Sequence, residues 1–377
     1  MESFDYRLKI YHPELMRIGI ILHGPEIVDT GSAKRIIDIL RRKHEVSAKL
    51  GGTMGRTAVL DAGLEGIIDI SKGLTPSETI LSIKDSIDLA MLLNHGKTLE
   101  TGRFFGRIVA SKILQVPLVH IERPDSDGRI IYYSNEVKRC AEYIKQMLRE
   151  TYDLPIEFSC SAPLHIRVDG DLVIRRISGA FVGENIRLDG IVIGEVTHPE
   201  PEIVCKYGRV VELRGIKVKQ HGLEKLENRR IDLFTAKVKT GSIRRSLHKP
   251  KIRKMLGGTR IAIIDHCAES TFEFVKDAGL VVTVGDDTTA IAADILARLG
   301  IPVIGIVDGD MDDVLENGVV PSGSVIIRVR YGFDDIVGRK VREELMEGGQ
   351  KISMVRSELL ARILALAKEY VVDVKYY

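Results

Sequence analysis

The fold of this chain is decided by the stretch that runs from residue 278 to residue 310, AGLVVTVGDDTTAIAADILARLGIPVIGIVDGD. Within it, the apolar run Leu280–Val284 has the length of a buried strand, and the residues from Thr289 to Leu299 have the spacing of a helix. Gly300 ends that helix, and Pro302–Val307 is a second apolar run of strand length. A strand, a helix and a strand in this order predict a βαβ unit of a parallel sheet.

The same alternation occupies the first part of the chain. Ile18–Leu22 and Pro117–Ile121 are typical of buried strands, and Ala33–Arg42 is typical of an amphipathic helix. Near the end of the chain, Ser324–Val329 is expected to be the last strand and Ser357–Glu369 a closing helix. The sequence therefore predicts an α/β protein with two Rossmann-like lobes of βαβ units.

A different pattern lies between these lobes. Beyond Pro155, short β-rich segments are separated by turns such as Asp169-Gly170 and Asp189-Gly190, which favour hairpins. We expect a small antiparallel β domain here, either a sandwich or a partial barrel. The predicted domains are an N-terminal Rossmann-like domain at 1–152, a β-rich domain with a basic stretch at 153–256, and a C-terminal Rossmann-like domain with its closing helix at 257–377.

Size and composition agree with several compact domains. A chain of 377 residues, 44% of them hydrophobic and 29% charged, is too long for one ordinary core and is typical of globular proteins. Its longest apolar runs have strand length, far short of the roughly 20 residues that span a bilayer, and the first residues lack the apolar stretch of a signal peptide. We expect a cytoplasmic protein without a membrane partner.

Charge is distributed unevenly along the chain. From Arg214 to Arg260, fifteen Lys or Arg residues stand against three acids, so this stretch carries +12. Because the whole chain carries +2, the remainder carries −10. The basic stretch is consistent with nucleic-acid binding and also with a solvated face that contacts the acidic lobes.

An acidic run follows the second strand of the deciding stretch. Asp308, Asp310 and Asp312 come directly after the apolar run, at the carboxyl end of a strand, where open α/β sheets bind ligands. Hard oxygen donors in a glycine turn suit Mg²⁺, and Asp265 ends an earlier strand of the same lobe. We predict a magnesium site at these four residues, with Asp308 also in a catalytic role; the alternative is a solvated turn in which one Asp caps a helix.

The turn before the helix of this unit offers further polar groups. It contains a glycine, two acids and two hydroxyls at a helix start, where backbone N–H groups bind phosphate well. The alternative is simple capping of the helix. Because this turn and the acidic run follow successive strands, we expect them to lie side by side and predict ligand binding by Gly285, Asp286, Asp287, Thr288 and Thr289.

This second lobe contains a glycine turn with Thr288-Thr289 and, later, Asp308-Gly309-Asp310. In these two features it resembles the toprim domain of primases and topoisomerases. That family holds Mg²⁺ with an Asp-x-Asp and an earlier Glu for phosphoryl or phosphodiester chemistry. The resemblance implies that Asp308 and Asp310 are metal ligands, while Asp265 stands where the Glu is expected. The whole chain also resembles an uncharacterised family from methanogenic archaea, which implies a cytoplasmic setting.

Two turns of the first lobe are also candidates. Gly52, Thr53 and Arg56 belong to a glycine-rich turn able to bind an anion, although the turn lacks the phosphate-binding pattern of a P-loop; the alternative is a plain loop. His95 and Lys97 follow a strand. Because a histidine side chain can change its charge near neutral pH, we predict a catalytic role for His95 and for Lys97. The alternative is a structural role. Nearby, His120-Ile121-Glu122-Arg123 ends another strand, with an ion pair expected between Glu122 and Arg123.

Three functions remain open on this evidence. The first is an Mg²⁺-dependent protein that acts on or binds a phosphorylated small molecule or a nucleotide, through phosphoryl-transfer or phosphodiester chemistry. The second is a nucleic-acid-binding module that uses residues 214–260. The third is a non-catalytic sensor or assembly factor for a small anion. The residues do not decide whether the protein is an enzyme.

Overall fold

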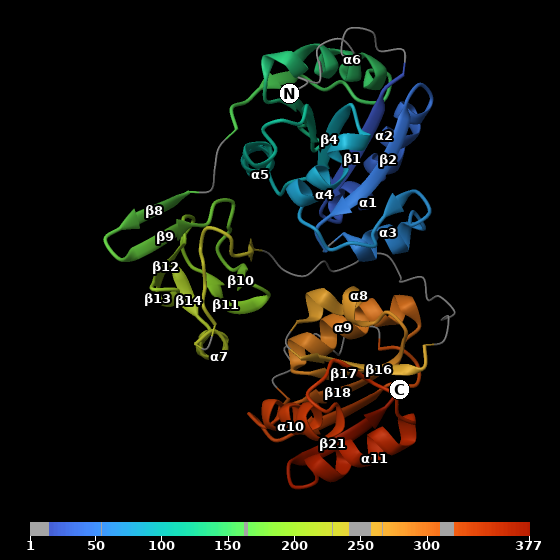
Figure 1. Ribbon diagram of the computed structural model, residues 1–377, viewed down its shortest axis with the longest axis vertical. Helices are drawn as coiled ribbons and strands as arrows, with labels where there is room; N and C mark the ends of the chain where they lie inside the picture. Colours follow the sequence, from blue (N-terminus) through green and yellow to red (C-terminus); the bar gives the residue numbers. More distant parts are fainter. Residues whose placement is uncertain are drawn as a thin grey trace, which may run out of the picture. The chain divides into compact units, whose positions relative to one another are not determined.

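The computed structural model describes residues 15–53, 55–161, 165–227, 229–240, 258–265, 267–309 and 320–377 (Figure 1). By its internal contacts the chain divides into two compact units, Met1–Arg244 and Arg245–Tyr377. The division into three domains that the sequence suggests stays a prediction. The molecule is a mixed α/β protein whose two larger sheets are mostly parallel.

The first sheet has seven strands in the order β3-β2-β1-β4-β5-β6-β7. Strands β3, β2, β1, β4 and β5 are mutually parallel, and β6 runs antiparallel to β5. The chain builds this sheet outward from β1 in one direction and then in the other, so the order reverses between β1 and β4. The strands are β1 Arg17–His23, β2 Glu45–Gly51, β3 Ile68–Asp69, β4 Leu89–Asn94, β5 Leu118–Glu122, β6 Arg129–Tyr132 and β7 Ile156–Phe158.

Helices cover both faces of this sheet because the strand side chains alternate between them. On β1, Ile18, Ile20 and Leu22 pack with helices α1, α2, α3 and α6, whereas Ile21 packs with α4 and α5. The central parallel strands β1, β4 and β5 are therefore buried on both sides, as an apolar parallel sheet requires. The helices are α1 Glu26–Asp29, α2 Ser32–Arg41, α3 Arg56–Ala62, α4 Pro76–Ile83, α5 Leu99–Lys112 and α6 Lys138–Leu148.

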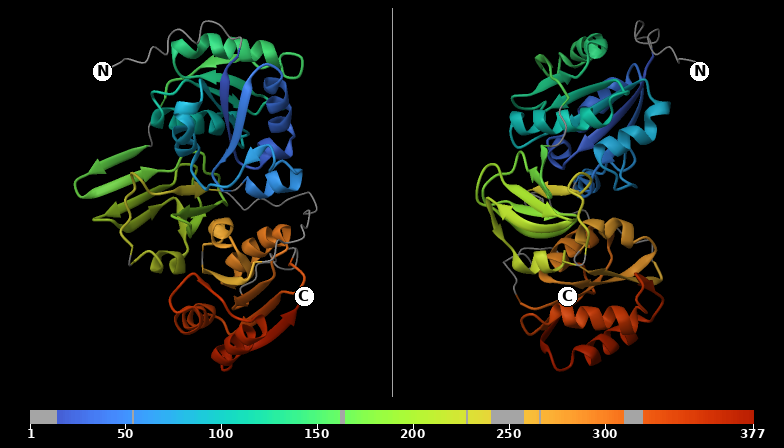
Figure 2. Two further views of the ribbon diagram at one scale, coloured as in Figure 1. Left: turned by 45° about the vertical axis from the view of Figure 1, so that its right-hand side comes forward. Right: turned by 60° about the vertical axis from the view of Figure 1, so that its left-hand side comes forward.

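The β-rich part of the first unit is made of two four-stranded antiparallel sheets, in the orders β14-β11-β10-β15 and β13-β12-β9-β8 (Figure 2). One apolar core takes residues from both sheets, for example Ile186 and Ile193 from one and Ile203 from the other. The elements are β8 Ile166–Asp169, β9 Leu172–Arg176, β10 Asn185–Leu188, β11 Ile191–Val196, β12 Glu202–Lys206, β13 Arg209–Arg214, β14 Ile216–Val218, α7 Gln220–Glu224 and β15 Val238–Thr240.

The second unit is built on a six-stranded sheet in the order β20-β16-β17-β18-β19-β21, with β16 to β19 parallel. Helices α8 and α9 lie on one side of it and α10 and α11 on the other (Figure 1). The elements are β16 Arg260–Asp265, α8 Thr271–Phe274, β17 Ala278–Val284, α9 Asp286–Leu299, β18 Val303–Val307, β19 Val325–Val329, α10 Asp334–Lys340, β20 Lys351–Ile352, α11 Arg356–Ala367 and β21 Val371–Tyr376.

Two expectations about elements need correction. Ser324–Val329 is not the last strand, because β21 follows α11 and pairs antiparallel with β19. Helix α9 begins at Asp286 rather than at Thr289, so the two aspartates and Thr288-Thr289 belong to its first turns. The acidic first turn suits the positive end of the helix dipole, which explains why the helix starts earlier than its apolar spacing indicates.

Across the described parts of the chain, none of the helices has the length and apolar character needed to cross a membrane.

Candidate functional site

The carboxyl end of the first sheet gathers polar side chains from three adjacent strands. His23 ends β1, Asn94 ends β4 and Glu122 ends β5, and the strand register places these three residues directly beside one another. Because the strand order reverses between β1 and β4, this is the position at which open α/β sheets bind their ligands.

A continuous chain of hydrogen bonds joins these side chains. His23 Nδ1 lies 2.8 Å from Asn94 Oδ1, and Asn94 Nδ2 donates to Glu122 Oε2 at 2.7 Å. His120 Nε2 lies 3.0 Å from the same Glu122 oxygen, and its Nδ1 lies 3.0 Å from the Tyr133 hydroxyl. We call these five residues, His23, Asn94, Glu122, His120 and Tyr133, the polar chain.

Glu122 is the charged centre of the polar chain although its side chain is completely buried. Burial by itself raises the pKa of this carboxyl group, but His120, the backbone N–H of Gly96 and the amide of Asn94 outweigh burial and lower the pKa. The Gly96 N–H donates to Glu122 Oε1 at 2.6 Å, so both carboxylate oxygens accept hydrogen bonds. Glu122 therefore stays ionised in the interior at neutral pH.

Helix α5 closes over the polar chain through two glycines. A Cβ atom added at Gly102 would lie 2.0 Å from Glu122 Cδ, and one added at Gly106 would lie 2.2 Å from the Tyr133 hydroxyl oxygen. Both positions therefore require glycine, since any side chain would overlap the carboxylate or the hydroxyl. From the same helix, Phe105 stacks on the His23 ring with 4.0 Å between ring centroids.

The glycine-rich turn predicted to bind an anion lies next to His23. Gly52 follows β2 with a φ of +98°, and a Cβ atom there would lie 3.8 Å from His23 Cδ2. Lys239, from β15 of the antiparallel part, donates to Thr53 Oγ1 at 3.3 Å. Arg56, by contrast, is completely buried at the start of α3. Lys239 is thus held at this turn, close enough for its charge to act on His23.

The other candidates of the first lobe lie just beyond β4. His95 Nε2 is 3.4 Å from Asp125 Oδ1, and Lys97 forms an ion pair with Glu184. Glu122 and Arg123, expected to pair with each other, take different partners: the Arg123 guanidinium contacts Asp127 and the backbone oxygen of Gly96. Arg123 lies just beyond the end of β5 with a φ of +48°, so the chain turns between the two residues and their side chains separate.

In the second unit, the candidate residues follow three adjacent parallel strands, as expected. Asp265 ends β16 and lies 4.0 Å from an Arg342 nitrogen, and Asp308 follows β18 and accepts the Gly332 N–H at 2.9 Å. Gly285, with a φ of +95°, connects β17 to α9. Asp286 and Asp287 form the first turn of that helix, while Thr288 and Thr289 are buried.

The two threonines serve the interior of this unit. Thr289 Oγ1 lies 2.8 Å from Thr283 Oγ1, so this hydroxyl joins α9 to β17.

The other two predicted magnesium ligands, Asp310 and Asp312, lie outside the described residues. Within the described ranges, no three His, Cys, Asp or Glu side chains converge in the way a metal site requires. The oxygen donors of Asp265 and Asp308 are of the kind that Mg²⁺ prefers, and magnesium stays a prediction.

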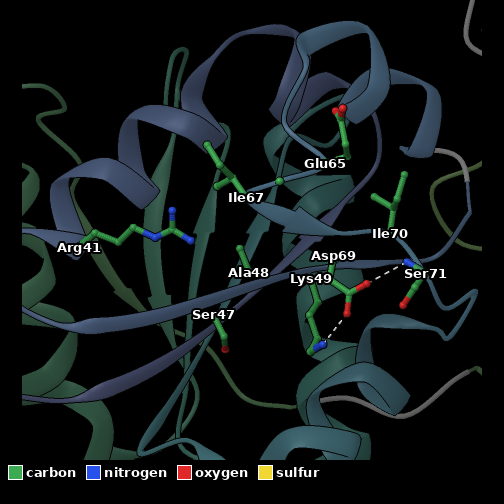
Figure 3. A pocket seen from close by; sticks show the side chains of 10 residues that line it. Arg41, Ser47, Ala48, Lys49, Glu65, Ile67, Asp69, Ile70 and Ser71 are labelled. Carbon is green, nitrogen blue, oxygen red and sulfur yellow. Dashed lines mark hydrogen bonds and ion pairs between the residues drawn. The ribbon is translucent and has the colours of Figure 1, made fainter. Parts of the chain in front are cut away.

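A hollow of about 480 Å³ lies elsewhere on the first sheet, along β2 and β3 (Figure 3). Two of its four charged residues, Lys49 and Asp69, form an ion pair of 2.6 Å, and the lysine ammonium holds the pKa of Asp69 well below its usual range. Because Lys49 and Asp69 neutralise each other and the hollow lies at the edge strand β3, away from the strand reversal, we regard the polar chain as the stronger candidate site.

Fold and site together define a mixed α/β protein with a buried polar chain at the strand reversal of its first sheet. The model of a family described as "Uncharacterized protein conserved in archaea" matches residues 20–349, and the chain belongs to this family. It is also 42% identical over 335 residues to an uncharacterized protein from Methanocaldococcus jannaschii, a match that covers 88% of this chain and 92% of that protein. The expected archaeal family is thereby confirmed.

Reasoning from the sequence did not place His23 in a candidate site. The sequence signal was its position, since this histidine follows the first apolar run and precedes a glycine. In the structure that glycine, Gly24, has a φ of +78°. Asn94 and Glu122 each end a strand too, and the three positions gain meaning only when the strand order makes them neighbours.

Proposed function

We propose that the protein binds a phosphorylated small molecule or a nucleotide at the carboxyl edge of its first sheet, between β1 and β4. The observation that carries this proposal is the polar chain itself, which ends at the partly exposed His23 beside the turn of Gly52 and Thr53. An ordered set of buried polar groups at a strand reversal is the usual setting of a ligand site in this class of sheet.

The charges at this edge favour an anion as the ligand. Lys239 reaches the hydroxyl of Thr53, and its positive charge lowers the pKa of His23 in addition to the larger effect of burial. A phosphate near Thr53 would accept hydrogen bonds from both the Lys239 ammonium and the hydroxyl. The Rossmann-like character of this lobe, which its strand order favours, is part of the proposal.

The proposal extends to magnesium and to the second unit. There, a toprim-like arrangement would place Asp265 and Asp308, together with Asp310 and Asp312, as oxygen ligands for Mg²⁺. Such an ion supplies charge neutralisation during phosphoryl-transfer or phosphodiester chemistry. The topology supports this part, since β16, β17 and β18 are parallel neighbours whose carboxyl ends share one edge.

Isothermal titration of the full chain with ADP and with inorganic phosphate tests the site on the first sheet. We expect both to bind, and Lys239→Ala to weaken ADP by about tenfold, the equivalent of one charge-assisted hydrogen bond. Lys206→Ala is the matched control, because this lysine also belongs to the antiparallel part but faces Asp171. Equal affinity of wild type and Lys239→Ala would rule out this edge as the phosphate site.

Repeating the ADP titration with and without MgCl₂ tests the metal. Asp308→Asn should abolish any strengthening of ADP binding by Mg²⁺ and leave the binding without Mg²⁺ unchanged. If MgCl₂ does not change the ADP affinity of the wild type, the magnesium site is contradicted, while the phosphate site on the first sheet is not. Failure of both ADP and phosphate to bind, with binding of a mixed RNA that weakens steeply with salt, would favour the basic stretch and a nucleic-acid function instead.

A further inference from the structure

The hydrogen atoms of the polar chain are fixed by the charge of Glu122. An ionised carboxylate only accepts hydrogen bonds, so each neighbour must turn a donor toward it. Asn94 therefore presents its NH₂ group to Glu122 Oε2, and its Oδ1 is left facing His23. In the same way His120 turns an N–H on Nε2 toward Glu122, and its Nδ1 lies 3.0 Å from the Tyr133 hydroxyl.

This arrangement of hydrogen-bond donors and acceptors determines the tautomer of His23. Because Asn94 Oδ1 can only accept, His23 Nδ1 must donate to it across the 2.8 Å contact. In a neutral imidazole the other nitrogen, Nε2, then holds a lone pair. The Cδ2 edge of the ring borders the Gly52 turn, since a Cβ atom at Gly52 would lie 3.8 Å from Cδ2, and the His23 side chain is partly exposed.

The surroundings of His23 keep its ring neutral. Burial, the largest influence, lowers the pKa of His23, and the charges of Lys239 and of His120 act in the same direction. The hydrogen bond with Asn94 and the charge of Glu122 oppose this effect without reversing it. The ring is also fixed in orientation, since Phe105 stacks on it and Asn94 holds its Nδ1.

We propose that His23 is a general base, oriented by Glu122 through Asn94, which accepts a proton on Nε2 from a hydroxyl group or a water molecule of the ligand bound at this edge. This inference deepens the proposed function and rests on it. In the step, the O–H bond breaks, its electron pair stays on the oxygen, and the proton forms the new N–H bond. The imidazolium that results is stabilised by Asn94 Oδ1 and by the negative charge of Glu122.

Nitrogen-detected NMR of histidine-labelled full-length protein tests this assignment directly, since the chemical shifts of the two ring nitrogens report which one carries the proton. The chain has ten histidines, and His23→Gln identifies the resonance. We expect His23 to be neutral at pH 7 and protonated on Nδ1. His44 is an internal control with the opposite expectation, because its Nδ1 accepts the Met16 N–H at 3.3 Å and its Nε2 faces the Tyr143 hydroxyl.

A matched variant makes the test sharper. In Glu122→Gln the Gly96 N–H still requires an oxygen, so the new NH₂ group faces Asn94 and His120. Asn94 must then turn its oxygen inward, and the proton of His23 must move to Nε2, while His44 does not change. A wild-type His23 protonated on Nε2 would overturn the inference even if the variant failed to fold.

The same spectra separate this inference from the proposed function. Adding ADP should shift the Nε2 resonance of His23, as expected for a nitrogen that accepts a hydrogen bond from the ligand. If His23 has the expected tautomer but neither ADP nor phosphate binds, the proposed function fails. If ADP binds and the His23 nitrogens do not shift, the general base is refuted and the binding site remains.

Discussion

A carboxylate as deeply buried as that of Glu122 persists only because its neighbours replace the hydration that it loses. Its oxygens accept three hydrogen bonds, from Asn94, His120 and the backbone of Gly96. Of these three donors, only the histidine is able to carry a positive charge. Acidic side chains are almost never fully buried without such partners, and a buried carboxylate with its own set of donors is typical of side chains that serve a site rather than the core.

The first prediction concerns pH. Because the pKa of Glu122 is lowered in the folded protein, the unfolded chain takes up this proton first as the pH falls. The stability that the carboxylate contributes is therefore complete above the ordinary glutamate pKa of about 4.3 and is lost as the pH falls through the lowered value. Wild type should lose stability in this range, and Glu122→Gln should depend less on pH.

At neutral pH, Glu122→Gln should be less stable by about 1 to 3 kcal/mol, because neutral hydrogen bonds replace charge-assisted ones. Urea unfolding from pH 3 to 7, followed by circular dichroism, measures both effects. Glu150→Gln, at an exposed position, is the control and should follow wild type. The same pH dependence in wild type and Glu122→Gln would show that the carboxylate is not ionised in the fold.

At the scale of elements, α5 determines how closely the polar chain is enclosed. Gly102 and Gly106 are one helical turn apart and form the face of the helix that contacts Glu122, His120 and Tyr133. Strand β5 supplies the opposite wall. A helix without these glycines would have to lie farther from the sheet, and the contact of Phe105 with His23 would be lost.

The second prediction tests this contact. Gly106→Ala should destabilise the protein by about 1 to 3 kcal/mol, although alanine favours a helix over glycine by about 1 kcal/mol, because the new Cβ atom overlaps the Tyr133 hydroxyl and His120 Nδ1. Thermal unfolding by circular dichroism measures the change. Gly66→Ala is the control, since a Cβ atom there meets no atom within 4 Å. A Gly106→Ala protein as stable as this control would contradict the close packing.

The turns show what local sequence reveals about elements. Asp189-Gly190 was predicted to form a hairpin, and both residues have positive φ values of 48° and 89° between β10 and β11, as a two-residue type I′ turn requires. Tyr207-Gly208 makes a similar turn between β12 and β13, with φ values of 50° and 80°. It was not predicted, because tyrosine is uncommon in the first position and the signal is therefore weak.

At the scale of the molecule, each unit has its own core and its own sheets. The polar chain and its neighbours Thr53 and Lys239 all belong to the first unit. The predicted magnesium ligands all belong to the second. The two proposed sites can therefore be studied separately.

The third prediction follows from this division. A shortened chain of residues 1–244 should fold by itself, with cooperative thermal unfolding, because every strand of its three sheets finds its partners within it. It should also keep the Nδ1-protonated His23. Circular dichroism and the histidine spectra measure these properties against the full chain. An unfolded or aggregated product would show that the first unit depends on the second.

The sequence alone determined the alternation of strands and helices, the antiparallel character of the middle part and the polar ends of several strands, because these depend on local periodicity and turn chemistry. Only the tertiary structure decided which strands are neighbours. His23, Asn94 and Glu122 are separated by 71 and 28 positions along the chain, and they form one site because the strand order reverses between β1 and β4. Strand order depends on long-range packing of whole faces, which no local pattern encodes.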